Sequence, residues 1–259
     1  MKIVWPNALF LCFVIGVCLA SAAFGQTIVN FGITSAGPNN LADIYTDPYN
    51  GVVNGTPVLA FCDDFTDEIS PPESWTAYDT NLSQLPDSPT TVYFSGGTVY
   101  GTTYSETTEY IAAAMLAMQS LQTSDVNTQN ELSFALWDIF DPNVFGTNAS
   151  NPILCPYGCM TSTQADAAVS DVQSALTAAA ALTTKYGATA GVEFEALNNV
   201  SVNIYTPETN GVAGKPAAEG PQEFITVKTP EPSGAAILGF DLLSVLAGIY
   251  LVRRYRVRA

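Results

Sequence analysis

Three cysteines beyond residue 25 are the side chains best suited to covalent chemistry. Cys155 and Cys159 flank Pro-Tyr-Gly, and this turn-forming spacing favours a local disulfide in an oxidising compartment. Cys62 is then the odd thiol, which we expect to be a small buried hydrophobe, with a reactive thiol as the alternative. The sequence has no histidine, which excludes a Ser-His-Asp triad, a Cys-His dyad and a His-ligated zinc site.

The densest acidic cluster is the run from residue 63 to residue 68. Its acidic side chains Asp63, Asp64, Asp67 and Glu68 offer the oxygen ligands that calcium prefers. The run lacks the glycine and the ligand spacing of an EF-hand loop, so a solvated turn is the favoured interpretation and a calcium site the alternative. The sequence indicates no other cofactor.

Acidic and aromatic side chains allow two further kinds of site. A pair of carboxylates could serve a glycosidase, although so acidic a chain offers many accidental pairs. Aromatic rings could line a sugar-binding face, but at strand spacing we expect core or cross-strand packing instead. The rings concerned are those of Trp75, Tyr78, Tyr93, Phe94, Tyr100 and Tyr104.

The charge of the chain excludes one class of partner. Its 24 acidic and eight basic residues give a formal net charge of −16, and residues 26–229 hold 22 of the acidic residues but only three lysines. Such a body repels a phosphate backbone, so we expect no binding to nucleic acid. With 47% hydrophobic and 11% aromatic residues, the body is nevertheless expected to fold.

Residues 1–25 have the pattern of a secretory signal peptide. Lys2 precedes an apolar run from Ala8 to Ala20, and Ala23-Phe24-Gly25 fits the small-x-small cleavage pattern. The run would form a helix only about 20 Å long, too short for the ~30 Å hydrocarbon core of a bilayer. We therefore expect export from the cytoplasm, with an uncleaved anchor helix as the alternative.

Residues 230–259 combine three features in order. Pro230-Glu231-Pro232 precedes an apolar segment, of which residues 235–252 would form a helix roughly 27 Å long, just enough to span a bilayer. An arginine cluster follows and is expected to remain in the cytoplasm, which leaves the body outside it. Asp241 interrupts the apolar segment and makes the anchor marginal. The arginines are Arg253, Arg254, Arg256 and Arg258.

This terminus resembles the PEP-CTERM sorting signal of Gram-negative bacteria. In that family an exosortase acts near the Pro-Glu-Pro motif, and the proteins are delivered to the cell surface or the extracellular matrix. The resemblance implies that Pro230, Glu231 and Pro232 are recognition residues. It also implies that the inner membrane holds the precursor transiently and that an exosortase-type enzyme processes it. An ordinary tail anchor is the alternative.

We expect residues 26–229 to form one α+β domain, with short strands on both sides of a helical middle. Ser105, Thr128-x-x-Glu131 and Thr163-x-x-Asp166 are the expected helix starts. Apolar residues three and four apart predict helices around 111–118, 132–139 and 169–186. Alternating apolar residues between turn residues predict strands at 27–33, 57–61, 91–94, 98–104, 192–197, 200–205 and 223–227.

Part of this body resembles the thioester-type domains of bacterial surface proteins. The residues that carry the resemblance are Phe61-Cys62-Asp63, a predicted helix over 110–121, and Phe134-Ala135-Leu136-Trp137-Asp138. Those domains join a cysteine to a glutamine and capture a surface nucleophile, and their cysteine corresponds to Cys62. Their glutamine position, four residues before the tryptophan, is Ser133 here, and a hydroxyl cannot supply the acyl group. Gln129 lies one helical turn earlier, roughly 6 Å along the axis.

These features together predict a non-enzymatic exported protein of the bacterial surface or extracellular matrix. Its acidic, polar surface would suit a hydrated exopolysaccharide. A thioester-type covalent adhesin that uses Cys62 is one alternative, and a secreted glycan-active enzyme is another.

Overall fold

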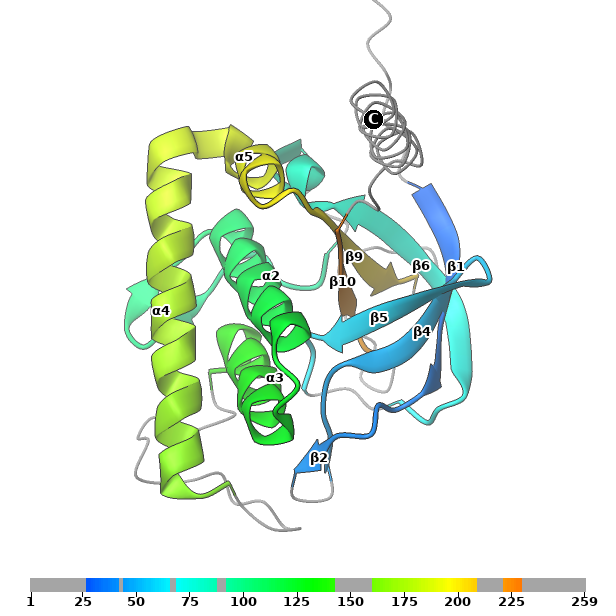
Figure 1. Cartoon of the computed structure of the whole chain (residues 1–259). Helices are drawn as coiled ribbons and strands as arrows, with labels where there is room; N and C mark the ends of the chain where they lie inside the picture. Colours follow the sequence, from blue (N-terminus) through cyan, green and yellow to red (C-terminus); the bar gives the residue numbers. More distant parts are fainter. Residues whose placement is uncertain are drawn as a thin grey trace, which may run out of the picture.

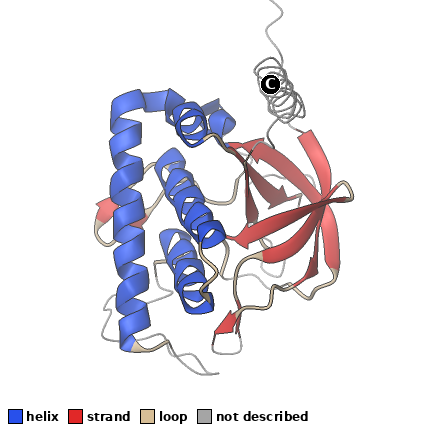
Figure 2. Ribbon diagram, viewed as in Figure 1, coloured by secondary structure: helices blue, strands red, loops and turns tan. Residues whose placement is uncertain are grey.

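The structure is a computed structural model that describes residues 27–41, 44–65, 69–87, 92–142, 160–208 and 221–229. The expected signal peptide, the sorting signal with its helix at 235–252, and Cys155 and Cys159 lie outside these residues. The described part consists of a β-barrel and a group of helices packed beside it (Figure 1 and Figure 2). The expected mixture of helix and strand is confirmed, whereas the closure of the strands into a barrel was not predicted.

Six antiparallel strands close the barrel in the order β1-β4-β5-β10-β9-β6. Residues Phe61 and Cys62 at the end of β5 pair with Ile225 and Phe224 of β10, which brings Cys62 beside the last strand of the described chain. The bounds are Thr27–Ser35 (β1), Tyr49–Val53 (β4), Thr56–Cys62 (β5), Glu73–Asn81 (β6), Ser201–Pro207 (β9) and Phe224–Lys228 (β10).

Aromatic side chains fill the barrel. The Phe31 ring stacks on that of Tyr205 with centroids 4.8 Å apart, and it lies 5.3 Å from Trp75 and 5.4 Å from Phe224. Tyr49 meets Phe224 edge-on at 5.6 Å. Such rings bury a large apolar area each, and offset or edge-on pairs add a favourable quadrupole interaction. A narrow barrel is therefore held together by a core of its own.

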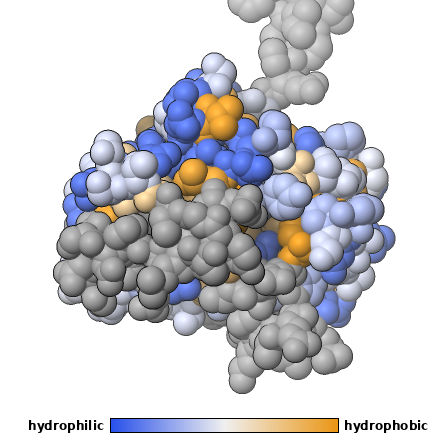
Figure 3. All heavy atoms as spheres, turned by 90° about the horizontal axis from the view of Figure 1, so that it is seen from below, coloured by the Kyte–Doolittle hydropathy of each residue, from blue (hydrophilic) through white to orange (hydrophobic). Residues whose placement is uncertain are grey.

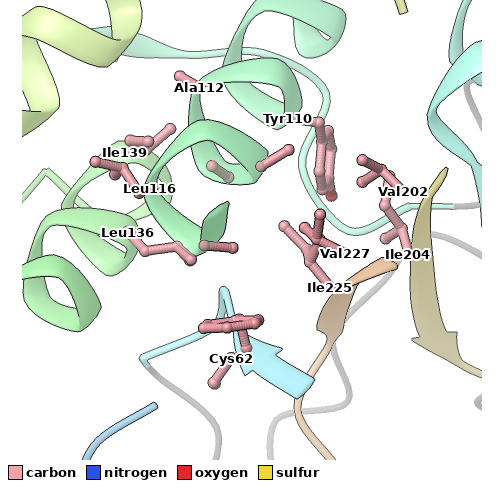
Figure 4. Close-up of a cluster of buried hydrophobic side chains, with 14 of the residues drawn as sticks. Cys62, Tyr110, Ala112, Leu116, Leu136, Ile139, Val202, Ile204, Ile225 and Val227 are labelled. Carbon is pink, nitrogen blue, oxygen red and sulfur yellow. The ribbon is translucent and has the colours of Figure 1, made fainter. Parts of the chain in front are cut away.

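The helices pack on the side of the barrel formed by β5 and β10, where α2 contacts β10 and α3 contacts β5. Figure 1 shows α2 between α4 and the barrel, and Figure 4 shows Tyr110 of α2 lying against Val202, Ile204 and Val227. Fully buried alanines on α2, among them Ala112 and Ala117, let the neighbouring helices approach closely. The bounds are Glu106–Gln122 (α2), Val126–Phe140 (α3), Ser162–Tyr186 (α4) and Ala190–Asn198 (α5).

Each of the three long helices begins at a residue whose side chain caps it. One of these three caps was predicted, and the other two were not. Ser105 caps α2 as expected, and its side chain accepts the Thr108 N–H. The predicted start at Thr128-x-x-Glu131 is wrong, because Asp125 accepts the Thr128 N–H at 2.9 Å and begins α3 one turn earlier. The predicted Thr163-x-x-Asp166 start is also wrong, since Thr161 forms a capping box with Gln164.

The segment predicted as a strand at 192–197 is the helix α5 instead. Val192, Phe194 and Ala196 alternate with polar residues, which is typical of a strand, but the buried side chains of α5 include Ala190 and Phe194, four apart. A Cβ on Gly191 would lie 2.5 Å from the Leu82 carbonyl oxygen, so the glycine allows close packing on the short helix η1, Leu82–Asp87. This packing favours the helix.

The other predicted strands have mixed outcomes. Strands at 27–33, 57–61, 200–205 and 223–227 are confirmed as β1, β5, β9 and β10, with slightly different ends. Residues 92–94 are not in a strand, and the strand predicted at 98–104 is a short hairpin of β7, Thr98–Val99, and β8, Thr102–Thr103. The strands β4 and β6 were not predicted. A second small hairpin joins β2, Asn40–Leu41, to β3, Ile44–Tyr45.

The described surface is largely polar. Seen from below, the described residues are mainly hydrophilic, with small, separate hydrophobic spots between them (Figure 3). Among the described helices, none has both the length and the apolar character needed to cross a bilayer.

Candidate functional site

Cys62 is fully buried at the point where the barrel meets the helices. Its backbone N–H donates to the Asp47 Oδ1 at 2.8 Å, and its thiol donates to the Asp64 carbonyl oxygen at 3.0 Å. Of the two predictions for this residue, a small buried side chain matches its position. Asp47 precedes β4 and was not predicted as a site residue, because it occurs within a run of turn-forming residues, Asp-Pro-Tyr-Asn-Gly.

Asp47 also contacts Ser133, the residue at the glutamine position of the thioester-type pattern. The Ser133 Oγ accepts the Asp47 N–H at 2.9 Å and donates to the Gln129 carbonyl oxygen at 3.1 Å. Asp47 therefore connects Cys62 and Ser133, which lie in β5 and α3. Cys62 and Ser133 are the two positions that the thioester-type resemblance pairs, and both form hydrogen bonds with Asp47. Ser133 offers a hydroxyl where a thioester would require the amide of a glutamine.

Gln129 is engaged elsewhere in the same network. Its Oε1 accepts from the Asn39 amide at 2.7 Å, and its Nε2 donates to the carbonyl oxygens of Ser120 and Thr123 at 3.2 and 3.0 Å. These contacts fix the loop between α2 and α3 and the chain before β4. Gln129 therefore has a structural role in the network.

Burial controls the protonation of Cys62 and Asp47. Removal from water raises the pKa of the Cys62 thiol well above its usual range, and the nearby Asp47, Asp64 and Asp63 carboxylates raise it further. Burial also raises the pKa of Asp47 to about 8, against the opposing effect of the Cys62 N–H and the Ser133 hydroxyl. A neutral thiol is a poor nucleophile, so this environment suppresses thiolate chemistry.

We expect Cys62 to resist alkylation in the folded protein. Iodoacetamide at neutral pH should leave it unmodified in the native chain and label it fully in denaturant, because the thiol is both buried and protonated. Peptide mapping by mass spectrometry resolves Cys62 from the other cysteines. Rapid labelling of Cys62 without denaturant would contradict this prediction.

A second buried cluster lies beside Cys62 and is built around Glu223. The Glu223 Oε1 accepts from the Tyr110 hydroxyl, while Oε2 accepts from the Thr206 hydroxyl and from the Tyr93 N–H, the last at 3.0 Å. Asp63 is fully buried next to it, and its backbone N–H donates to the Glu223 carbonyl oxygen at 3.4 Å. The cluster therefore joins β5, β9, β10 and α2.

Asp63 and Glu223 are two fully buried residues whose carboxyl groups lie close to each other. Burial raises the pKa of Asp63 well above its usual range, and the Glu223 carboxylate raises it further. Burial also raises the pKa of Glu223, although the donors around it favour its charged form. Two neighbouring buried carboxyl groups cannot both ionise readily, which favours the protonated form of Asp63.

Two further acidic residues, Glu106 and Glu109, lie in the first turn of α2. Burial raises the pKa of Glu106 to about 7, with Glu223 as the second cause. Burial likewise raises the pKa of Glu109 to about 7, although its Oε1 accepts the Gly97 N–H at 2.7 Å. A row of neighbouring acidic residues therefore leads from Asp63 and Glu223 to Glu106 and Glu109, and sequence reasoning missed all of its members except Asp63.

The structure corrects the interpretation of the acidic run 63–68. Asp63 is fully buried and Asp64 is 2% exposed, so the favoured solvated turn is wrong for these two residues. Asp67 and Glu68 lie outside the described residues. Within the described ranges no group of three or more acidic or cysteine side chains is arranged to hold a metal ion, and the calcium alternative stays a prediction.

The six aromatic residues proposed for a sugar-binding face are separated by the fold. Trp75 packs inside the barrel against Phe31, as expected for core packing. The Tyr78 hydroxyl donates to Glu208 at 3.5 Å, and Tyr100 donates to Asp138 from the tip of the β7–β8 hairpin. Tyr104 packs against the core, whereas Tyr93 and Phe94 line a surface hollow.

Comparison with known proteins adds no family assignment. The sequence matches no protein-family model and no curated protein, and the structure matches no solved structure.

Proposed function

We propose that this chain is a non-enzymatic protein of the cell surface or extracellular matrix of a Gram-negative bacterium. It is exported by residues 1–25, held briefly in the inner membrane by residues 235–252, and processed by an exosortase-type enzyme at Pro230-Glu231-Pro232. The strongly acidic composition of residues 26–229 supports a place in a hydrated matrix. The folded body then acts by its surface.

The geometry around Cys62 is the single observation that carries the non-enzymatic part of this proposal. The thiol is buried and donates to a carbonyl oxygen, and the partner position holds Ser133, whose hydroxyl is used in hydrogen bonds to Asp47 and Gln129. A hydroxyl carries no acyl group to transfer to sulfur. This arrangement supports a structural network at the place where the resembling domains carry their reactive bond.

Replacement of Glu231 by alanine is expected to leave uncut precursor in the membrane fraction. The change removes the acidic residue of the recognition motif, and it follows the last strand of the barrel in the sequence, so we expect the fold of the body to be unaffected. Immunoblotting of membrane and extracellular fractions measures the distribution. Glu208→Ala, which changes a partly buried glutamate of the body, is the control and should be processed normally. Wild-type protein that keeps its Arg253–Arg258 tail in its own cells would overturn the sorting proposal.

A thioester-type adhesin is the second candidate, because Asp47 contacts both Cys62 and Ser133. Formation of a thioester between a cysteine and a glutamine expels ammonia, so an intact bond lowers the mass of the chain by that amount. The intact mass of the mature protein therefore separates the two candidates. A mass equal to that of the unmodified chain supports the structural network, and a mass lower by one ammonia supports the adhesin.

A further inference from the structure

A hollow of about 210 Å³ lies between the segment before α2 and the ends of α2 and α3. Tyr93, Phe94 and Gly97 line it from the loop, Glu109 lines it from α2, and Phe140 lines it from α3. Pockets for drug-sized ligands measure roughly 300–1,000 Å³, so this hollow fits a smaller molecule. It is separate from the Cys62 network, and the proposed function does not use it.

Aromatic rings form one wall of the hollow. The Phe94 and Phe140 rings lie 4.6 Å apart and are both partly exposed, and Tyr93 meets Phe94 edge-on at 6.4 Å. Phe140 also packs on Tyr110 at 4.9 Å, which anchors this wall to the buried cluster around Glu223. A rigid wall of aromatic carbon favours a ligand with an apolar face.

Polar groups also line the hollow. The Gly97 N–H donates to the Glu109 Oε1 at 2.7 Å, so the carboxyl group is fixed in direction and is 2% exposed as a residue. The backbone of residues 95–98 lines the hollow beside it. A fixed carboxyl group next to main-chain groups can bind hydroxyls that both donate and accept hydrogen bonds. One ligand face is thus apolar and the other carries hydroxyls.

Charge narrows the class of ligand further. Among the described residues, the lining contains no lysine or arginine, and residues 26–229 hold 22 acidic residues and three lysines, which disfavours phosphates and other anions. Glu109 is the single acidic residue of this described lining, which is too few for a divalent cation. Burial keeps this carboxyl group partly protonated near neutral pH. A neutral ligand fits these conditions.

We propose that the hollow binds one neutral sugar unit, with its C–H face on the Phe94 and Phe140 rings and its hydroxyls on Glu109 and the backbone of residues 95–98. A pyranose presents this combination of an apolar face and a rim of hydroxyls. The inference rests on the proposed matrix function in one respect: the sugar unit would come from an exopolysaccharide of the matrix.

Replacement of Gly97 by leucine tests the hollow. A Cβ added at Gly97 meets only the Glu109 Oε1 within 4 Å, at 3.4 Å, so a larger side chain enters the hollow without striking the backbone. Thr56→Leu, on an exposed position of β5, is the matched control. Glucose, galactose, mannose and N-acetylglucosamine are the probes, titrated into the full chain and followed by saturation-transfer NMR. We expect binding of at least one sugar by the wild type and the control, and an at least tenfold loss in Gly97→Leu.

A second variant keeps the test decisive if Gly97→Leu unfolds, which circular dichroism would reveal. Phe140→Leu preserves an apolar side chain but removes the ring, and it should also weaken sugar binding by about tenfold.

Three results would each overturn the inference. They are equal sugar binding by the wild type and both folded variants, no binding of any probe, and binding of calcium that Glu109→Gln abolishes. Polysaccharide binding that survives Gly97→Leu would leave the matrix function intact and reject the hollow. Sugar binding in the hollow by a protein that remains in the membrane uncut would reject only the matrix function.

Discussion

The free energy of unfolding is expected to fall as the pH rises from about 4 to about 9, and Asp47 alone contributes about 5 kcal/mol to this fall. The raised pKa of the buried Asp63 acts in the same direction. In the folded chain burial raises the pKa of Asp47 to about 8, from 3.8 when it is exposed. The protonated form is therefore favoured by folding. Its stabilising contribution is fully present below about pH 4 and is lost as the pH approaches the folded pKa.

Glu106 and Glu109 act in the same direction. Burial raises the pKa of both to about 7, so each favours folding at acidic pH and opposes it above neutrality. Glu106 is partly exposed, so solvent screening makes its contribution smaller than that of Asp47, and the pKa shift of Glu109 is itself smaller than that of Asp47. The direction is opposite to that of most proteins, in which paired carboxylates make the folded state more stable as the pH rises from acid to neutral.

Urea unfolding at about pH 5 and about pH 9 measures this effect, with Asp47→Asn as the test variant. The asparagine Oδ1 can still accept the Cys62 N–H, and the side chain is neutral at every pH. We therefore expect a much flatter pH profile and a variant more stable than the wild type at the higher pH. Asp171→Asn, at a partly buried position on α4, is the control and should keep most of the slope. A wild-type stability that rises with pH would contradict the prediction.

The helices were predictable from the sequence because their signals are local. Apolar residues three and four apart identified α2, α3 and α4, and Ser105 identified the start of α2. The other two starts were wrong because several polar residues near each start could serve as caps, and the choice depends on which side chain reaches the free N–H groups. Residues 192–197 belong to the helix α5 instead of the predicted strand because Gly191 packs on Leu82, a residue far away in the sequence.

The barrel could not be predicted because its pairings connect distant parts of the chain. β6 lies between β1 and β9, and β5 pairs with β10 over only two residues. Strand β4 begins within the turn-forming run Asp-Pro-Tyr-Asn-Gly and contains Gly51, and β6 exposes the three residues Glu73, Ser74 and Thr76 near its start. Such segments have little alternation of their own, and their neighbours in the sheet decide their conformation.

The candidate site was predictable at Cys62, Asp63 and Ser133: the first two stand out by residue type, and the thioester-type resemblance indicated the third. Their partners Asp47, before β4, and Glu223, before β10, come from other segments of the chain. An acidic residue in a polar-looking segment gives no sign of burial when the groups that surround it come from elsewhere. The donors around Glu223 compensate for its burial, and they become visible only in the folded chain.

Replacement of Glu223 by alanine is expected to lower the free energy of unfolding by about 4 kcal/mol or more. The change leaves the hydroxyls of Tyr110 and Thr206 and the Tyr93 N–H without their acceptor in a fully buried space. Each orphaned buried donor costs about 1–3 kcal/mol, and the vacated volume adds a cavity term. Urea unfolding at about pH 5, where the carboxyl row is least charged, separates this loss from the pH effect.

Glu73→Ala is the matched control for Glu223→Ala, because Glu73 is an exposed glutamate of β6 whose side chain accepts the Ser70 N–H at 3.0 Å. It should change the unfolding free energy by no more than about 1 kcal/mol. Tyr110→Phe removes one donor but keeps the ring between α2 and the barrel, so its loss should fall between those of the two alanine variants. Equal stabilities of Glu223→Ala and Glu73→Ala would mean that the Glu223 cluster does not hold the helices to the barrel. The graded order is expected because the number of buried hydrogen bonds lost sets the cost: three in Glu223→Ala, one in Tyr110→Phe and none in Glu73→Ala, whose hydrogen bond is exposed.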